Sequence, residues 1–195
     1  SQEMGLTKQP LSQNHIKNCE IVLNREDLIA KLPKNRSVAE IGVDKGEFSE
    51  KILSIAHPKI LHLVDLWDFK NYGNEKYELV SQKFEKLIIN GKVVIHKKLS
   101  IDAAHDFPDE YFDWIYIDTD HTYQTTRDEL QAYAEKIKPE GFISGHDYTK
   151  GNFVKAIRVG VIEAVHEFCV DYHWELAYLT IDPIEIQSFA LRRIL

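Results

Sequence analysis

Short apolar runs alternate with helix-length segments along most of this chain, and this alternation restricts its fold more than any other feature. The apolar runs have the length of buried strands and cover residues 37–43, 60–66, 92–96, 112–118 and 142–145. The predicted helices, which carry apolar residues at helical spacing, cover residues 47–56, 74–89, 122–137 and 153–168. Elements in this order form right-handed β-α-β crossovers. The sequence therefore predicts a doubly wound, Rossmann-like α/β sheet that is mostly parallel.

The C-terminal part of the chain differs from this pattern. Residues 174–180 and 184–191 are predicted strands with little room between them, and Asp182 and Pro183 form the turn. A connection this short can only join antiparallel strands. We therefore expect an antiparallel hairpin at the C-terminus, which is unusual for a dinucleotide-binding Rossmann fold.

Two other segments complete the predicted organisation. Residues 1–35 are expected to form an N-terminal arm with a short helix at 26–32, and residues 36–195 a single domain. Residues 138–141, with the sequence Lys-Pro-Glu-Gly, are expected to make a tight turn before the fifth strand.

Composition restricts the partners and the location of the protein. The formal net charge of −7 predicts no nucleic-acid partner, because neutralising phosphates requires a basic face. No apolar run approaches the 18 residues of a membrane span, so we expect no membrane association. Cys19 and Cys169 lack any metal-binding or redox spacing, which is typical of a reduced cytoplasmic protein. A homo-oligomer is compatible with the sequence, which leaves the oligomeric state open.

The loop after the first strand reads A-E-I-G-V-D-K-G-E, and ligands bind beyond the carboxyl ends of the strands in a doubly wound sheet. Gly42 and Gly46 would let a ligand approach the backbone where helix amides favour an anionic group. The spacing G-x-x-x-G lacks the middle glycine of a dinucleotide fingerprint. Glu40 could accept a hydrogen bond from a cofactor ammonium. The alternative is a strand-to-helix turn that binds nothing.

The next two loops carry further polar candidates. Asp65 ends the second strand 19 residues after Gly46, and its two carboxylate oxygens could hold both hydroxyls of a ribose. Trp67 offers a flat face to an adenine ring, or is simply a core residue. Ser100 or Asp102 could face the adenine amine, although either residue could instead cap a helix.

Acidic and histidine residues gather after the fourth and fifth strands, at Asp118, Asp120, His121, His146 and Asp147. Adjacent parallel strands lie about 4.8 Å apart, so these side chains should meet at one edge of the sheet. Such oxygen and nitrogen ligands suit a divalent cation. Without a metal, His121 or His146 could act as a general base. The alternative is structural, with Asp120 and His121 capping the next helix and His146 and Asp147 forming a turn.

Four motifs together resemble the class I S-adenosylmethionine (SAM)-dependent methyltransferases. They read E-I-G-V-D-K-G, H-L-V-D-L-W, F-D-W-I-Y-I-D-T-D-H-T-Y and G-F-I-S-G-H-D-Y, and they span roughly residues 36–150. Within that family the chain is similar to the D-x-D-H-x-Y and G-H-D-Y group, which is related to catechol- and macrocin-type O-methyltransferases and to cephalosporin-hydroxylase-like proteins. The resemblance implies the class I fold, whose sheet ends in an antiparallel hairpin.

The resemblance also implies a cofactor and a set of site residues. It implies SAM contacts at Glu40, Gly42, Asp65, Ser100 and Asp118, and the loop residues Gly46, Trp67 and Asp102 are expected to contribute as well. By position, Asp118, His146 and Asp147 correspond to the ligands of a divalent cation, Mg²⁺ or Mn²⁺, in catechol-type enzymes. A histidine stands here where that family has an aspartate, which shifts the preference away from Mg²⁺.

The leading hypothesis is a SAM-dependent methyltransferase that modifies a hydroxyl oxygen of a small molecule, with His121, His146 and Asp147 as catalytic residues. An NAD-linked oxidoreductase is the first alternative, disfavoured by the missing glycine and the terminal hairpin. A non-catalytic SAM-binding protein is the second.

Overall fold

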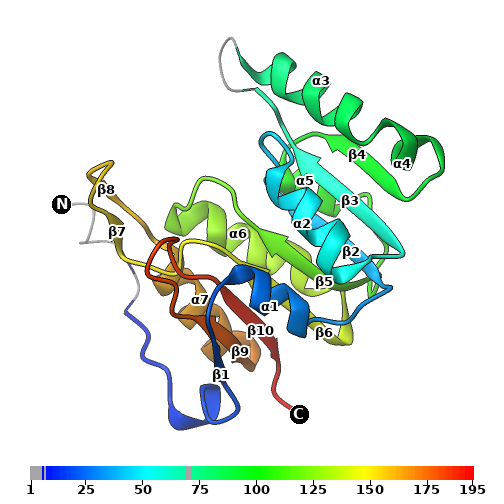
Figure 1. Ribbon diagram of the computed structural model, residues 1–195. Helices are drawn as coiled ribbons and strands as arrows, with labels where there is room; N and C mark the ends of the chain where they lie inside the picture. The colour runs from blue at the N-terminus through cyan, green and yellow to red at the C-terminus, as the bar shows by residue number, and fades with distance from the viewer. Residues whose placement is uncertain (1–5, 7, 69–71) are drawn as a thin grey trace.

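A computed structural model of the chain describes residue 6 and residues 8–68 and 72–195. An eight-stranded sheet with the strand order β1-β9-β10-β6-β5-β2-β3-β4 forms its centre (Figure 1). Its strands are β1 (Glu20–Val22), β2 (Ser37–Ile41), β3 (Ile60–Asp65), β4 (Val93–Lys97), β5 (Phe112–Ile117), β6 (Ile137–Gly145), β9 (Trp174–Thr180) and β10 (Phe189–Arg193). A separate small hairpin consists of β7 (Gly151–Asn152) and β8 (Ile157–Arg158).

Strand β10 alone in this sheet runs antiparallel to its neighbours. It pairs with β6 on one side and β9 on the other, and the remaining strand pairs are parallel. This confirms the predicted doubly wound sheet with an antiparallel C-terminal hairpin. The chain runs outward from β2 through β3 to β4 and then returns to β5 on the other side of β2. That reversal places the crevice for a ligand at the carboxyl ends of β2 and β5.

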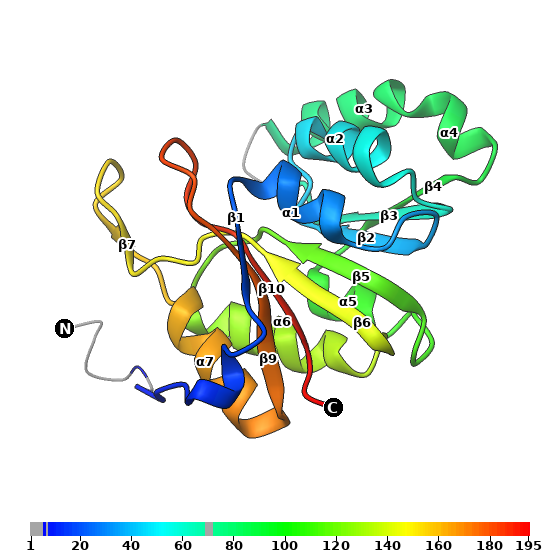
Figure 2. The same cartoon turned by 60° about the horizontal axis from the view of Figure 1, so that its bottom comes forward.

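Helices cover both faces of the sheet (Figure 2). One face carries α1 (Arg25–Lys31), α2 (Glu47–Ala56), α3 (Gly73–Lys83) and α4 (Glu85–Ile89). The other carries α5 (Ser100–Ala104), α6 (Tyr123–Ala134) and α7 (Val161–Tyr172). Trp114 and Tyr116 of β5 point into the first layer and are fully buried, each contributing about 2–3 kcal/mol by burial. Their polar atoms are satisfied, by the carbonyl of Pro33 and the hydroxyl of Ser188.

Three of the longer predicted helices have different bounds in the structure. The one predicted at 122–137 ends at Ala134, and Ile137 already begins β6. The helix predicted at 74–89 breaks at Phe84, whose ring turns into the core against Gly46, so that α3 and α4 are separate. The helix predicted at 153–168 begins only at Val161. The preceding Gly160 packs against the backbone of Tyr123, where a Cβ atom would lie 2.4 Å from the nitrogen, and residues 151–158 form the β7–β8 hairpin instead. This contact between distant segments fixes where α7 starts.

The predicted turn at residues 138–141 lies inside β6. Ile137 already pairs with Phe112, and Phe142 pairs with Trp114, so β6 carries extra residues in a bulge at this point. The predicted strand at 184–191 is also shorter, because β10 begins at Phe189. The loop before it is closed by Gln187, whose side chain accepts from the backbone nitrogen of Asp182 and donates to its carbonyl, both at 2.9 Å.

The segment before residue 36 contributes to the sheet and to the core. Strand β1 pairs in parallel with β9 at the sheet edge. Asn24 caps α1 by accepting from the backbone nitrogen of Asp27 at 2.9 Å, and Leu28 and Ile29 of that helix are fully buried. Across the described ranges, every helix falls short of the length and apolar content that a bilayer crossing requires.

Candidate active site

A cavity of about 430 Å³ opens at the carboxyl ends of β2, β3, β4 and β5. Five of the residues expected to contact a cofactor line it, namely Gly42, Asp65, Trp67, Ser100 and Asp118. They come from four different loops, which the parallel sheet brings to one edge. This size falls within the range of small-molecule sites, about 300–1,000 Å³.

Gly42 allows the first loop to pass close to the end of β5. Its φ of +94° is a conformation that favours glycine, and a Cβ atom there would lie 2.0 Å from the carbonyl oxygen of Asp118. The backbone nitrogen of Gly42 donates to Val64 at 2.8 Å, and that of Asp118 donates to Ile41 at 2.7 Å. Gly46, also at positive φ, is the N-cap of α2 and packs against Phe84 rather than the cavity.

Asp65 organises the first loop through its carboxylate. One oxygen accepts from the backbone nitrogens of Val43 and Asp44, at 2.8 and 2.9 Å, and the other from that of Trp67 at 2.9 Å. The Trp67 indole in turn donates to the Asp44 carbonyl at 2.9 Å, and Lys76 pairs with the Asp44 carboxylate. The second oxygen of Asp65 keeps a lone pair for a ligand hydroxyl.

Besides Gly46, two of the expected cofactor residues lie away from the cavity. Glu40 lies on the face of β2 that α1 and α2 cover, is 2% exposed and accepts from the Ser49 hydroxyl. Burial raises the pKa of this carboxyl to about 8. Asp102 lies on the exposed side of α5, because Ala103 and Ala104 turn that helix's buried side toward the core.

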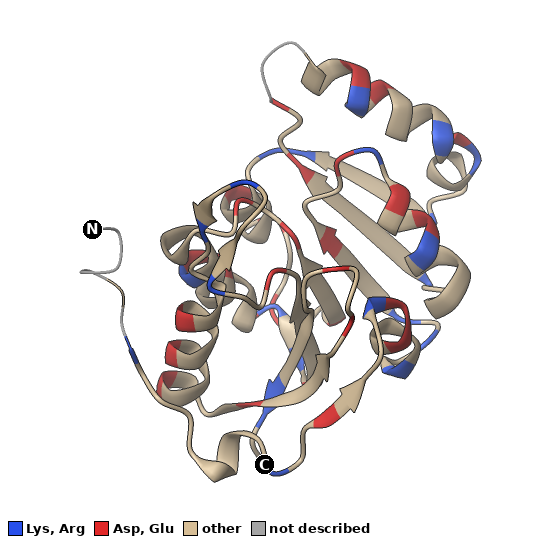
Figure 3. Ribbon diagram, turned by 60° about the vertical axis from the view of Figure 1, so that its left-hand side comes forward, with Lys and Arg blue, Asp and Glu red and all other residues tan. Residues whose placement is uncertain are grey.

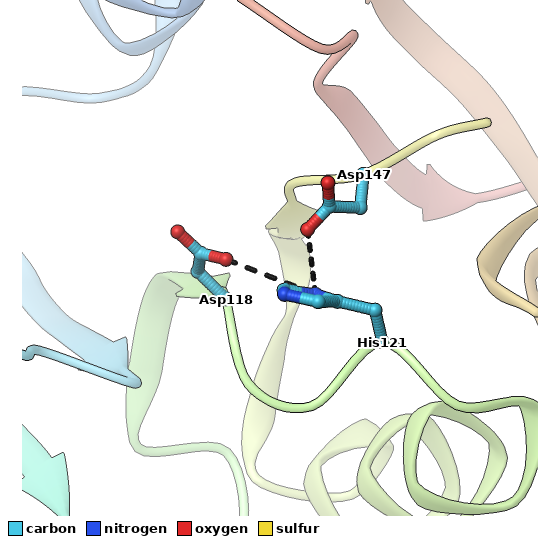
Figure 4. Close-up of side chains that lie close together, drawn as sticks. All are labelled: Asp118, His121 and Asp147. Atoms are coloured by element: carbon cyan, nitrogen blue, oxygen red, sulfur yellow. Dashed lines mark ion pairs between the residues drawn. The ribbon is translucent and has the colours of Figure 1, made fainter. Parts of the chain in front are cut away.

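The acidic and histidine residues converge as expected (Figure 4). His121 Nδ1 lies 2.6 Å from Asp147 Oδ2 and 3.9 Å from Asp118 Oδ1. His146 Nδ1 lies 3.2 Å from the same Asp147 oxygen and 3.7 Å from Asp118 Oδ1. Asp120 holds the intervening turn, since its carboxylate accepts from the backbone nitrogen of Thr122, the N-cap of α6.

Burial and charge act in opposite directions on these groups. Burial raises the pKa of Asp118, and the two histidines reduce that effect without cancelling it. For Asp147, burial alone would raise the pKa, but hydrogen bonds from His121 and His146 hold it well below its usual range. Burial alone would lower the pKa of His121, and the contact with Asp147 reverses this, so that the pKa is raised.

The backbone at the cluster is strained. His121 and Asp147 have φ values of +65° and +60°, in the left-handed region that residues other than glycine rarely adopt. Residues in such conformations gather at functional sites, where the surrounding structure holds them in place. Here the two left-handed residues direct their side chains at each other.

The ligand atoms of Asp118, His121 and Asp147 all lie within 4.8 Å of one another. This trio differs from the expected metal set in having His121 in place of His146. His146 stays at the edge of the group, and its Nε2, which is buried and without a hydrogen-bond partner in the described chain, lies 3.9 Å from Glu185. Two carboxylates and one imidazole fit a divalent ion, and the imidazole favours a transition ion such as Mn²⁺ over Mg²⁺.

A second cavity of about 210 Å³ adjoins the cluster. Its floor consists of Asp118, His121, His146 and Asp147, and its walls come from the β7–β8 hairpin and from Ile186 in the β9–β10 loop. Both loops project from the same side of the molecule (Figures 1 and 2). Asp118 lines both this cavity and the larger one.

Several site residues were not predicted from the sequence. Glu129 of α6 and Thr119 line the larger cavity, and Asn152 and Lys155 of the hairpin line the smaller one. The signal for Glu129 is its spacing, because it lies four residues before Tyr133 on the apolar side of the helix, where an acid is unusual. The hairpin residues gave no signal, since that segment resembled the start of a helix.

Comparisons with known proteins agree with this geometry. Similar structures include a SAM-dependent methyltransferase from Aquifex aeolicus (TM-score 0.62, 14% identity, 87% of this chain and 89% of that chain). A methyltransferase from Streptococcus mutans in complex with SAH, S-adenosylhomocysteine, has a TM-score of 0.58 and 15% identity over 86% and 93% of the two chains. An rRNA methylase from Streptococcus thermophilus has a TM-score of 0.60 and 12% identity over 88% and 95%. A comparison with curated proteins gave no match.

Identities this low show the fold alone, whereas the family assignment comes from the sequence. A family model described as a methyltransferase domain matches residues 39–148, which is more than half of the chain and includes all four motifs. The chain therefore belongs to this methyltransferase-domain family, and it has the Rossmann-like fold of the class I SAM-dependent methyltransferases.

Proposed function

We propose that this protein transfers a methyl group from SAM to a hydroxyl oxygen of a small molecule. The observation that carries the proposal is that Asp118 lines two cavities, one of about 430 Å³ and one of about 210 Å³. A methyl donor in the larger cavity and an acceptor in the smaller one would face each other across the acid–histidine cluster. The relationship to catechol-type enzymes, which rests on the motifs, is part of this proposal.

The larger cavity suits an adenosyl cofactor. Gly42 keeps the first loop close to β5, and Asp65 offers a carboxylate at the end of β3, where a ribose would lie in a doubly wound fold. The first loop has no middle glycine for a pyrophosphate, which favours SAM over NAD. SAM supplies an electrophilic methyl group on sulfur, so the protein has to align the acceptor and remove its proton.

The cluster offers two ways to remove that proton. His121 can take it directly, since its contact with Asp147 raises the pKa of the imidazole and stabilises the imidazolium that forms. Alternatively, Asp118, His121 and Asp147 would hold a divalent cation, which would lower the pKa of the acceptor hydroxyl. The donor set is compatible with either route, and removing metal from the protein separates them.

The smaller cavity favours a small acceptor over RNA. Its volume of about 210 Å³ lies below the range of sites for drug-sized ligands. Although one protein of similar fold is an rRNA methylase, this chain has a formal charge of −7, and two aspartates face the proposed acceptor space. Figure 3 shows acidic and basic residues interspersed along the ribbon on this side of the molecule.

Two experiments test the proposal. Calorimetric titration with SAH and with NAD identifies the cofactor, and the absence of SAH binding at millimolar concentration would overturn the proposal. Transfer of labelled methyl groups to a panel of catechols, hydroxy acids and short RNAs, with and without EDTA, identifies the acceptor class and the role of metal.

Variants of two aspartates link the activity to the cluster. Asp147→Asn should lower the transfer rate about 100-fold, because it weakens the partner of His121 or a metal ligand. The matched control is Asp113→Asn, since Asp113 lies near the opposite end of β5 and, among the described residues, its carboxylate bonds to Ser37 and Lys138 alone. Normal SAH binding with no transfer to any acceptor would favour a non-catalytic binding protein.

The proposal extends to the organisation and location of the protein. We place the methyltransferase domain at residues 36–195, with residues 1–35 as an N-terminal segment. Cys19 and Cys169 are both unpaired, which supports a reducing, cytoplasmic environment.

A further inference from the structure

Glu129 is a fully buried acid that joins two loops of the larger cavity. One of its carboxylate oxygens accepts from the Ser100 hydroxyl at 2.7 Å, and the other from the Thr119 hydroxyl at 2.8 Å. All three residues line the cavity. Tyr133, one turn further along α6, donates to the Ser100 carbonyl at 2.7 Å and fixes the same turn.

Burying a carboxylate here is less favourable for folding than burying an apolar side chain would be. A buried carboxylate loses its hydration, and among the described residues no lysine, arginine or histidine lies within ion-pair distance of Glu129 to compensate. Burial accordingly raises the pKa of Glu129 to about 7, although the two hydroxyl donors oppose the shift. A leucine at this position of the helix would fill the space at lower cost, so the acid serves another purpose.

The carboxylate determines the direction of both hydroxyl groups. An ionised carboxylate can only accept hydrogen bonds, so the protons of Ser100 and Thr119 both point toward Glu129. Each hydroxyl oxygen then retains only lone pairs for other partners. The cavity wall between the β4 and β5 loops therefore presents two hydrogen-bond acceptors and no hydroxyl donor.

We propose that Glu129 is a positioning residue that makes the cofactor cavity selective for a 6-aminopurine over a 6-oxopurine. The exocyclic amine of adenine carries two N–H donors, which match acceptors at Ser100 and Thr119. A 6-oxopurine has an oxygen in the same place. That oxygen is itself an acceptor, so it could form no hydrogen bond with the two hydroxyl oxygens. This inference rests on the proposed function, in that an adenosyl cofactor occupies the cavity.

The test compares SAH with its 6-oxo analogue, S-inosylhomocysteine, by calorimetric titration at about pH 8.5, where Glu129 is ionised. In Glu129→Gln, the side-chain NH₂ group donates to one of the two hydroxyls and turns that hydroxyl proton toward the cavity. SAH affinity should fall about tenfold and the affinity of the 6-oxo analogue should rise, so that the ratio of the two falls more than tenfold. Asp128→Asn is the matched control, because the Asp128 carboxylate bonds to no described residue other than Gln124.

A purely structural role gives a different result. If Glu129→Gln weakens the binding of both ligands by the same factor, or otherwise leaves the ratio of the two affinities unchanged, the proposal is wrong. Thr119→Val provides the same test without altering Glu129, because it removes one acceptor at nearly constant volume, and selectivity should again fall. If wild-type protein binds neither ligand, the proposed function fails; if it binds SAH and its 6-oxo analogue equally, only the role of Glu129 fails.

Discussion

Replacing Gly42 by alanine would place a methyl group where the backbone of Asp118 already lies. The added Cβ atom would be 2.0 Å from the carbonyl oxygen of Asp118 and 2.6 Å from its carbonyl carbon, whereas real Cβ contacts are longer than 3.0 Å. The carbonyl belongs to the residue that lines both cavities, so relief of this clash must move either the first loop or the end of β5. We expect Gly42→Ala to reduce both stability and SAH binding.

Gly91 provides a control that separates steric contact from backbone conformation. Its φ is +78°, close to the +94° of Gly42, but nothing lies within 4 Å of the Cβ position. Alanine at positive φ costs about 1–2 kcal/mol, and the loss of freedom in the unfolded chain returns about 0.4–1 kcal/mol. Gly91→Ala should therefore lower the free energy of unfolding by about 1 kcal/mol. Gly42→Ala adds an overpacking cost of about 1–3 kcal/mol, for a total of about 2–4 kcal/mol.

Urea unfolding followed by circular dichroism measures the free energy of unfolding, and calorimetric titration measures the affinity for SAH. Gly42→Ala should bind SAH at least about tenfold more weakly, because displaced loop residues no longer match the ligand. Gly91→Ala should bind it normally, since Gly91 lies outside the cavity. Equal losses of stability in the two variants would refute the close approach of the first loop to Asp118.

Three further predictions concern buried titratable groups. Burial lowers the pKa of His62 to about 4, so the free energy of unfolding is highest above pH 6.5 and falls, by at most about 3 kcal/mol, as the pH falls toward 4. In urea unfolding at pH 5, His62→Phe should therefore lose less of this free energy than wild type. Glu40 makes stability depend on pH in the opposite direction, because its raised pKa of about 8 lowers the free energy of unfolding as the pH rises from about 4.5 to 8. Glu40→Gln should therefore be more stable than wild type at pH 9, by on the order of 2 kcal/mol. Cys169 is fully buried, which raises the pKa of its thiol to about 12, so a thiol reagent should modify it only after denaturant is added, whereas half-buried Cys19 reacts in the native protein.

Elements with local start and stop signals could be predicted closely from the sequence. The helix at 47–56 and the strand at 174–180 have the same bounds in the structure as in the prediction. Gly46 and His57, both at positive φ, terminate that helix on either side. The start of α7 could not be predicted, because it depends on the contact between Gly160 and the backbone of Tyr123, which are far apart in sequence.

In the candidate site, too, residues placed by local features of the sequence could be predicted, whereas residues placed by long-range packing could not. Asp65 and Asp118 could be predicted to line a cavity because each ends or directly follows a strand of the parallel sheet. Asp102 follows a strand as well, but the rotation of a short helix decides which way it points, and it points to solvent. Glu129 is not at a strand end, and only the packing of α6 against two loops brings its carboxylate to the cavity.

The choice between His121 and His146 depends on backbone conformation that residue order does not reveal. Strand order alone places both imidazoles near Asp118 and Asp147, and the catechol-type pattern favours His146. In the structure, the left-handed conformation of His121 turns its Nδ1 to within 2.6 Å of Asp147. His146 directly follows β6, and its Nδ1 lies farther from Asp147, at 3.2 Å, although its distance of 3.7 Å from Asp118 is similar to that of His121. The backbone of this turn should therefore tolerate glycine, but not a β-branched residue, at position 121, because that residue itself has the left-handed conformation.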